Sequence, residues 1–100
     1  MTETVRYELR DGVALLLIDR PPVNAIDVAV RAGLIAGVAR AEADAAAKAV
    51  LIACAGRTFL SGADLSELNG PIAAPGYYEA LARIEACAKP VVAVLHGTAL

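Results

Sequence analysis

The chain has 100 residues, a formal net charge of −2 and 58% hydrophobic residues, which is enough for one modest core and one domain at most. No lysine/arginine cluster is present, which excludes the concentrated basic face of a nucleic-acid-binding protein. No apolar run approaches the roughly 18–20 residues of a membrane-spanning helix, and the opening MTETVRYELRDG mixes charges of both signs, unlike a secretory or transit peptide. We therefore expect a cytoplasmic protein with neither a membrane nor a nucleic-acid partner.

The first elements read as a β-hairpin. Val5, Tyr7 and Leu9 alternate with polar residues, the two-residue period of a half-buried strand. The dipeptide at 11–12, Asp-Gly, is a strong two-residue turn signal. The continuous apolar run at 13–18 is typical of a strand covered on both faces.

A helix is predicted next, from Val28 to about Ala46, after two prolines that forbid regular helix and with Asp27 as its N-cap. Apolar residues recur at helical spacing: Val30, Leu34, Ile35 and Val38. Charged residues take the other positions and predict a polar face: Arg31, Arg40, Glu42 and Asp44. Gly33 and Gly37 weaken a helix by roughly 1 kcal/mol each relative to alanine, so we expect close packing on a sheet to compensate.

The second half repeats the alternation of strand and helix. Residues 48–55 predict a strand, and the breakers in SELNGPIAAPG, residues 66–76, predict a loop. A helix is expected over 77–88, ended by Lys-Pro at 89–90. Its apolar stripe is expected from these positions: Tyr78, Leu81, Ala82 and Ile84, next to Glu85. VVAVL at 91–95 predicts another buried strand, and the order of elements gives an α/β fold class.

The stretch GRTFLSGADL, residues 56–65, follows the third strand directly and is both glycine-punctuated and apolar. Its glycines fit neither GxxxxGK[ST] nor GxGxxG, which argues against a nucleotide loop. Phe59 and Leu60 are expected to anchor the loop in the core. Gly62 and Ala63 let a ligand approach the backbone, and the N–H groups opening the short helical turn ADLSEL suit an oxyanion site. The alternative is a plain strand-to-helix turn with Asp64 as its first-turn acid.

Other side chains in this stretch offer weaker chemistry. Asp64 and Glu67 share a face of the helical turn and could form an acid/base pair, although capping is the commoner role of such residues. Ser61 lies in FLSGAD rather than GxSxG, so a nucleophile elbow is unsupported.

The metal and redox candidates are few. Cys54 and Cys87 form no CxxC pair, and Cys54 lies in an apolar run where a buried thiol behaves as a small hydrophobe. His96, the single histidine, is expected to hydrogen-bond at a strand end. We therefore expect no metal site and no disulfide.

Three motifs together resemble a known family. RPPVNAID at 20–27, GRTFLSGADL at 56–65 and KPVVAVLHGTAL at 89–100 occur in this order and separation in the crotonase superfamily, also called the enoyl-CoA hydratase/isomerase family. The resemblance extends from about Val5 to Leu100, and the wording is similar to the hydratase part of multifunctional fatty-acid oxidation enzymes. It implies a spiral of ββα turns, of which the chain supplies about the first two, and assembly into trimers or hexamers.

The resemblance also implies a site. The backbone N–H of Ala63 falls on the first oxyanion donor for an acyl-CoA thioester. Further substrate-binding positions fall on Asp64, Leu65 and Ser66, and on Ala25 and Ile26 near the CoA entrance. Arg20 is the basic residue available near RPPVNA for CoA phosphate. No separate cofactor is implied, because coenzyme A is part of the substrate.

The implied reaction is reversible hydration of a 2-enoyl-CoA, as in fatty-acid oxidation. The resemblance puts the second donor glycine and two catalytic glutamates after Leu100, so we expect residues 1–100 to be the N-terminal part of an acyl-CoA domain that ends before the GGG motif, without hydratase activity alone. Two alternatives stay open: another crotonase chemistry such as isomerisation, and a non-catalytic module for partner binding or assembly. A flavodoxin-like domain is disfavoured, because DRPPVNA lacks a Ser/Thr-rich ligand loop.

Overall fold

Strands and helices follow the predicted order in the computed structural model, which describes residues 3–100. The elements are β1 (Val5–Arg10), β2 (Val13–Ile18), β3 (Ala25–Ile26), α1 (Val28–Ala43), β4 (Ala49–Cys54), β5 (Gly62–Ala63), the 3₁₀ helix η1 (Leu65–Asn69), α2 (Tyr77–Glu85) and β6 (Val91–Ala93). No helix within the described residues is both long enough and apolar enough to cross a membrane.

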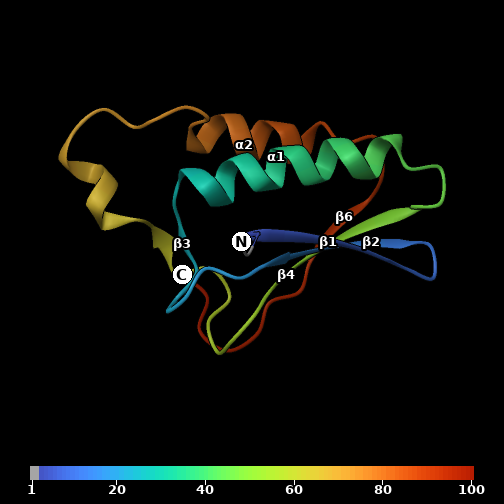
Figure 1. Cartoon of the computed structure of the whole chain (residues 1–100), viewed down its shortest axis with the longest axis horizontal. Helices are drawn as coiled ribbons and strands as arrows, with labels where there is room; N and C mark the ends of the chain where they lie inside the picture. The colour runs from blue at the N-terminus through green and yellow to red at the C-terminus, as the bar shows by residue number, and fades with distance from the viewer. Residues whose placement is uncertain (1–2) are drawn as a thin grey trace.

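A four-stranded mixed sheet in the order β1-β2-β4-β6 forms one layer of the fold. The hairpin pairs β1 antiparallel to β2, while β4 and β6 run parallel to their neighbours. Helices α1 and α2 lie side by side over one face of this sheet (Figure 1). The loops after β4 and after β6 lie toward the other side, and β3 and β5 form a separate two-stranded sheet at one end of the fold, near the start of α1. The predicted α/β class is confirmed.

The core lies between the sheet and α1. Alternate residues of β2 and β4 are fully or nearly buried and pack against the apolar residues of α1. The intervening residues of both strands are only half-buried, so the prediction that 13–18 is covered on both faces was wrong. The two helices lie on one face alone, which explains the alternation. Leu9, expected on the inner face, is exposed near the hairpin turn.

Helix α1 confirms the predicted N-cap. The Asp27 carboxylate accepts a 2.9 Å hydrogen bond from the Val30 N–H. The helix ends at Ala43, three residues before the predicted end at 46, with Asp44 as its C-cap. The close packing expected at its glycines is also confirmed, since a Cβ at Gly37 would lie 2.7 Å from Leu16 Cδ2.

Helix α2 is rotated relative to the prediction. Tyr78 is 88% exposed and Leu81 is also exposed, although both were expected in the apolar stripe. The buried side is formed by Ala80 together with the half-buried Tyr77 and Ile84. The helix ends at Glu85, three residues before the predicted end at 88, with Ala86 as the C-cap.

Strand β6 lies at the edge of the sheet rather than in its interior. Within the described residues it pairs with β4 on one side only. β6 ends at Ala93, and Val92, Val94 and Leu95 are exposed, so the prediction of a buried strand at 91–95 was wrong.

Candidate functional site

Asn24 fixes the turn that leads into the candidate site. Its side-chain amide donates to the carbonyl oxygens of Ala55 and Thr58, both at 2.8 Å, and its Oδ1 accepts from the Arg20 N–H at 2.8 Å. The residue is 3% exposed and has φ +54°, a left-handed conformation that asparagine tolerates better than most residues. Asn24 therefore ties the RPPVNA turn to the loop that follows β4.

The short strands β3 and β5 bring two distant parts of the sequence together. They pair in parallel, with Ala25 opposite Gly62 and Ile26 opposite Ala63. The expected site residues from the first motif thus lie directly beside those from the second. Ala63 is exposed at this pair, and Phe59 anchors the preceding loop in the core as predicted.

The turn after Ala63 is capped by its own side chains. Asp64 Oδ1 accepts from the Ser66 hydroxyl at 2.8 Å and from the Ser66 N–H at 3.0 Å, which makes Asp64 the N-cap of η1. These two hydrogen bonds lower the pKa of the Asp64 carboxyl, so it is ionised at neutral pH. Leu65, the next residue, is 78% exposed.

Four of the expected substrate-binding residues line one shallow pocket. Its volume is about 430 Å³, and its lining comprises Val23, Ala25, Ser61, Ala63, Asp64 and Leu65. Ser66 lies outside this lining, within η1, where its hydroxyl donates to the Asp64 cap. Ile26 instead lines an apolar cavity of about 300 Å³ between the helices and the sheet.

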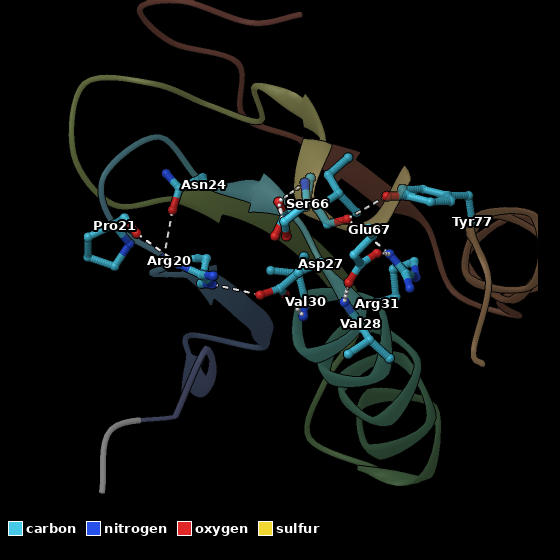
Figure 2. Close-up of polar contacts among 12 residues, drawn as sticks. Arg20, Pro21, Asn24, Asp27, Val28, Val30, Arg31, Ser66, Glu67 and Tyr77 are labelled. Atoms are coloured by element: carbon cyan, nitrogen blue, oxygen red, sulfur yellow. Dashed lines mark hydrogen bonds and ion pairs between the residues drawn. The ribbon is translucent and has the colours of Figure 1, made fainter. Parts of the chain in front are cut away.

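The sequence reasoning missed an ion pair between the buried Arg31 of α1 and the partly buried Glu67 of η1. Arg31, predicted on the polar face of the helix, is 0% exposed, and its Nη1 donates to Glu67 Oε1 at 2.8 Å. Figure 2 shows the Glu67 side chain extending from η1 to both Arg31 and Val28. Its second carboxylate oxygen accepts a 2.9 Å hydrogen bond from the Val28 N–H. A positive charge in the first turn opposes the helix dipole, and this was the one signal in the sequence that Arg31 needs a nearby acid.

Arg20 makes two hydrogen bonds within its own motif, and its charge also helps lower the pKa of the Asp64 carboxyl in the pocket lining. Its Nε donates to Asp27 Oδ2 at 2.6 Å, and its Nη1 donates to the Pro21 carbonyl at 3.0 Å (Figure 2). Its side chain is nevertheless 40% exposed.

The remaining candidates have structural surroundings. Burial raises the pKa of the Cys54 thiol to about 11, and both Cys54 and Cys87 are free. His96 Nε2 lies 2.8 Å from the Gly56 carbonyl oxygen, in the hydrogen-bonding role expected for it. Over residues 3–100 no three His, Cys, Asp or Glu side chains gather closely enough to hold a metal ion.

Comparison with known proteins places the chain in a family. Residues 8–100 match the family described as enoyl-CoA hydratase/isomerase. The chain is 43% identical over 96 residues to a peroxisomal bifunctional enzyme of Danio rerio, covering 95% of the chain and 13% of that protein. It is 38% identical over 103 residues to a probable enoyl-CoA hydratase of Rhodobacter capsulatus, covering 96% of the chain and 39% of that protein.

Solved structures agree with this match. A putative enoyl-CoA hydratase/carnitine racemase from Magnetospirillum magneticum superposes with a TM-score of 0.85 at 28% identity, over 97% of the chain and 40% of that protein. A probable enoyl-CoA hydratase/isomerase from Mycobacterium abscessus gives a TM-score of 0.82 at 29% identity, over 97% and 39%. The chain corresponds to the N-terminal part of these relatives and spans about 40% of the length of the two solved structures and 13% of the Danio rerio enzyme. It therefore belongs to the crotonase, or enoyl-CoA hydratase/isomerase, family.

Proposed function

We propose that the chain is the N-terminal part of an acyl-CoA domain of the enoyl-CoA hydratase type, in which the Ala63 N–H is one of two oxyanion donors. The observation that carries the proposal is the β3–β5 pair, which presents an exposed Ala63 at the rim of a pocket lined by Ala25 and Asp64. Family membership supports a thioester of coenzyme A as the ligand. The proposed reaction is the hydration of a 2-enoyl-CoA, and the proposed pathway for it is fatty-acid oxidation.

The chemistry of a thioester suits a backbone donor. Negative charge develops on the thioester oxygen when the neighbouring carbons react, and a fixed N–H group stabilises that charge without transferring a proton. The capping of η1 by Asp64 and Ser66 holds the backbone immediately after Ala63 in place. The absence of a bulky side chain at Gly62 and Ala63 leaves the backbone open to the ligand.

Both carboxylates near Ala63 take part in local structure. Asp64 Oδ1 caps η1, and both oxygens of Glu67 accept hydrogen bonds, one from the Arg31 side chain and one from the Val28 N–H. This supports the proposal that residues 1–100 bind an acyl-CoA but need a second donor and two glutamates from a longer domain for hydration. Removing a single oxyanion donor typically costs about 10²- to 10³-fold in rate, and each acid/base role is worth about 10²- to 10⁴-fold.

Calorimetric titration of the 100-residue chain tests the proposal. We expect butyryl-CoA to bind more tightly than S-butyl-CoA, the thioether in which a CH₂ group replaces the carbonyl. Free coenzyme A and the thioether should bind alike, apart from the contribution of the alkyl chain. Equal affinity for thioester and thioether, or no binding of any of the three, would overturn the proposed donor role.

A second candidate function is self-assembly, which the exposed apolar edge at β6 favours. Val92 on the open strand and Val94 and Leu95 just after it are all exposed, and an open strand with such side chains is a surface on which another chain can pair. The proposed assembly is a homotrimer or hexamer. Sedimentation equilibrium of the 100-residue chain tests it: a concentration-independent monomer mass would contradict assembly by this chain.

The zebrafish relative is named as peroxisomal, so the cytoplasmic location stays a prediction.

A further inference from the structure

Arg31 joins four segments of the chain, two of which lie beside the candidate site. Its Nε donates to the Pro75 carbonyl at 2.7 Å and its Nη2 to the Ala73 carbonyl at 3.1 Å, both in the loop before α2. Its Nη1 donates to the Ile26 carbonyl in β3 at 3.0 Å and to Glu67 in η1 at 2.8 Å. Its guanidinium also stacks 4.3 Å from the ring centroid of Tyr77, the first residue of α2.

Stability alone is a weak reason for this arrangement. Removing the Arg31 guanidinium from water is costly, and ion pairs with a buried member can often be replaced by apolar residues without loss of stability. Every nitrogen of Arg31 has an acceptor, so the group is fully satisfied rather than strained. The planar guanidinium has fixed donor directions, so it can set the geometry of several backbone segments at once. An apolar side chain cannot do this.

Two of those segments directly flank Ala63. Ile26 is the residue opposite Ala63 in the β3–β5 pair, and its carbonyl accepts both from Arg31 and from the Tyr77 hydroxyl at 2.9 Å. Glu67 belongs to the 3₁₀ turn that Ala63 leads into, and its N–H donates to the Asp64 carbonyl at 3.0 Å. The strand beside the donor and the turn after it are therefore held by the same guanidinium. Figure 2 shows the contact of Arg31 with Glu67 in that turn.

We infer that Arg31 is a positioning residue for the Ala63 N–H: it holds β3, η1 and the 70–76 loop so that this donor has a fixed direction. The expected consequence of this positioning is selectivity for a thioester carbonyl, and that consequence rests on the proposed function. Arg31 itself contacts no ligand in this account. Its effect is transmitted through the Ile26 carbonyl and Glu67.

Two variants test the inference in the 100-residue chain: Arg31→Lys and Tyr77→Phe. Arg31→Lys keeps the positive charge but loses the planar guanidinium with its fixed donor directions. Tyr77→Phe removes only the hydrogen bond from the Tyr77 hydroxyl to the Ile26 carbonyl, so it tests the inference if Arg31→Lys does not fold. The matched control is Arg83→Lys, because Arg83 pairs with Glu42 and also links α2 to α1, away from Ala63.

The first readout needs no ligand. Backbone ¹⁵N order parameters of residues 62–67 should be near the rigid value of about 0.85 in the unmodified chain and fall toward about 0.6 in Arg31→Lys. The second readout is the ratio of butyryl-CoA to S-butyl-CoA affinity, which should fall roughly tenfold at most, the worth of one hydrogen bond. The Arg83→Lys control should leave both unchanged.

The outcomes separate the two proposals. If the unmodified chain fails to distinguish thioester from thioether, the proposed function falls, and the order parameters still decide whether Arg31 holds the 62–67 segment. If the ratio and the order parameters in Arg31→Lys and Tyr77→Phe equal those of the unmodified chain, the positioning role is wrong. Equal effects in the Arg83→Lys control would reduce Arg31 to a general structural residue and would likewise overturn the inference.

Discussion

Replacing Asn24 tests whether the RPPVNA turn is held as the structure describes. Asn24→Ala removes two donated bonds, to the Ala55 and Thr58 carbonyls, and one accepted from the Arg20 N–H, all at 2.8 Å. Each intramolecular bond contributes about 0.5–1.5 kcal/mol net, so we expect a loss of about 2–4 kcal/mol in the free energy of unfolding. For a small domain this is a large fraction of a total that is typically about 5–15 kcal/mol.

Two companion variants separate the causes of that loss. Asn24→Gly also removes the three bonds but accepts φ +54° without strain, so it should be less destabilising than Asn24→Ala by about 0.5–1 kcal/mol. Asn24→Asp keeps the acceptor for Arg20 but turns a carboxylate toward two carbonyl oxygens, and should destabilise at least as much as alanine. Urea unfolding monitored by circular dichroism measures all three. A loss below about 0.5 kcal/mol for Asn24→Ala would refute the reasoning.

Three further predictions concern the core, the thiols and the charges. Gly37→Ala should destabilise by about 1–3 kcal/mol despite the better helix propensity of alanine, because its Cβ would lie 2.7 Å from Leu16 Cδ2; urea unfolding checks this, and a stabilised variant would contradict it. The Cys54 thiol, whose pKa burial raises to about 11, should react with a thiol reagent at pH 8 far more slowly than the half-buried Cys87, as mass spectrometry of the labelled peptides will report; equal rates would contradict the burial. Hydrogen bonds from the Arg83 side chain and a backbone N–H lower the pKa of Glu42 in the folded chain. The Glu42 carboxylate therefore contributes to the free energy of unfolding above the unfolded pKa of about 4.5, and this contribution is lost as the pH falls through the folded pKa. An acid unfolding midpoint that is unchanged in Glu42→Gln would contradict this.

Local sequence signals predicted the scaffold well. The Asp-Gly turn at 11–12, the Asp27 cap and the close contact at Gly37 each depend on neighbours within one element or on the helix–sheet contact that the glycine spacing indicates. Their physical causes are short-range, such as a left-handed turn residue, an orphan N–H and the room left by a missing Cβ. The fold class followed from the order of these elements.

Features that depend on distant partners could not be predicted in the same way. Helical periodicity assigns a charged residue to the surface, yet Arg31 is buried because Glu67 and the loop before α2 supply its acceptors. The face of α2 that packs inward is likewise set by where the helix lies over α1 and the sheet, which exposes Tyr78 rather than burying it. Both outcomes are decided by contacts of more than 30 residues in sequence separation.

The candidate site was predictable in location but not in its support. The motifs indicated that residues around 25 and 63 act together, and the β3–β5 pair brings them side by side. The ion pair of Arg31 with Glu67 carries no motif of its own. The donor role of Ala63 stays a prediction until a ligand is measured on it.

The most direct test of that role replaces the Gly62–Ala63 amide with an ester by semisynthesis, which removes one N–H and leaves every side chain unchanged. A control ester at Glu79, an exposed residue in the first turn of α2, loses an N–H remote from the pocket. We predict that the ester at Ala63 lowers the affinity for butyryl-CoA roughly tenfold while the affinity for S-butyl-CoA and the behaviour of the control stay unchanged. An unaltered preference for the thioester would contradict the account.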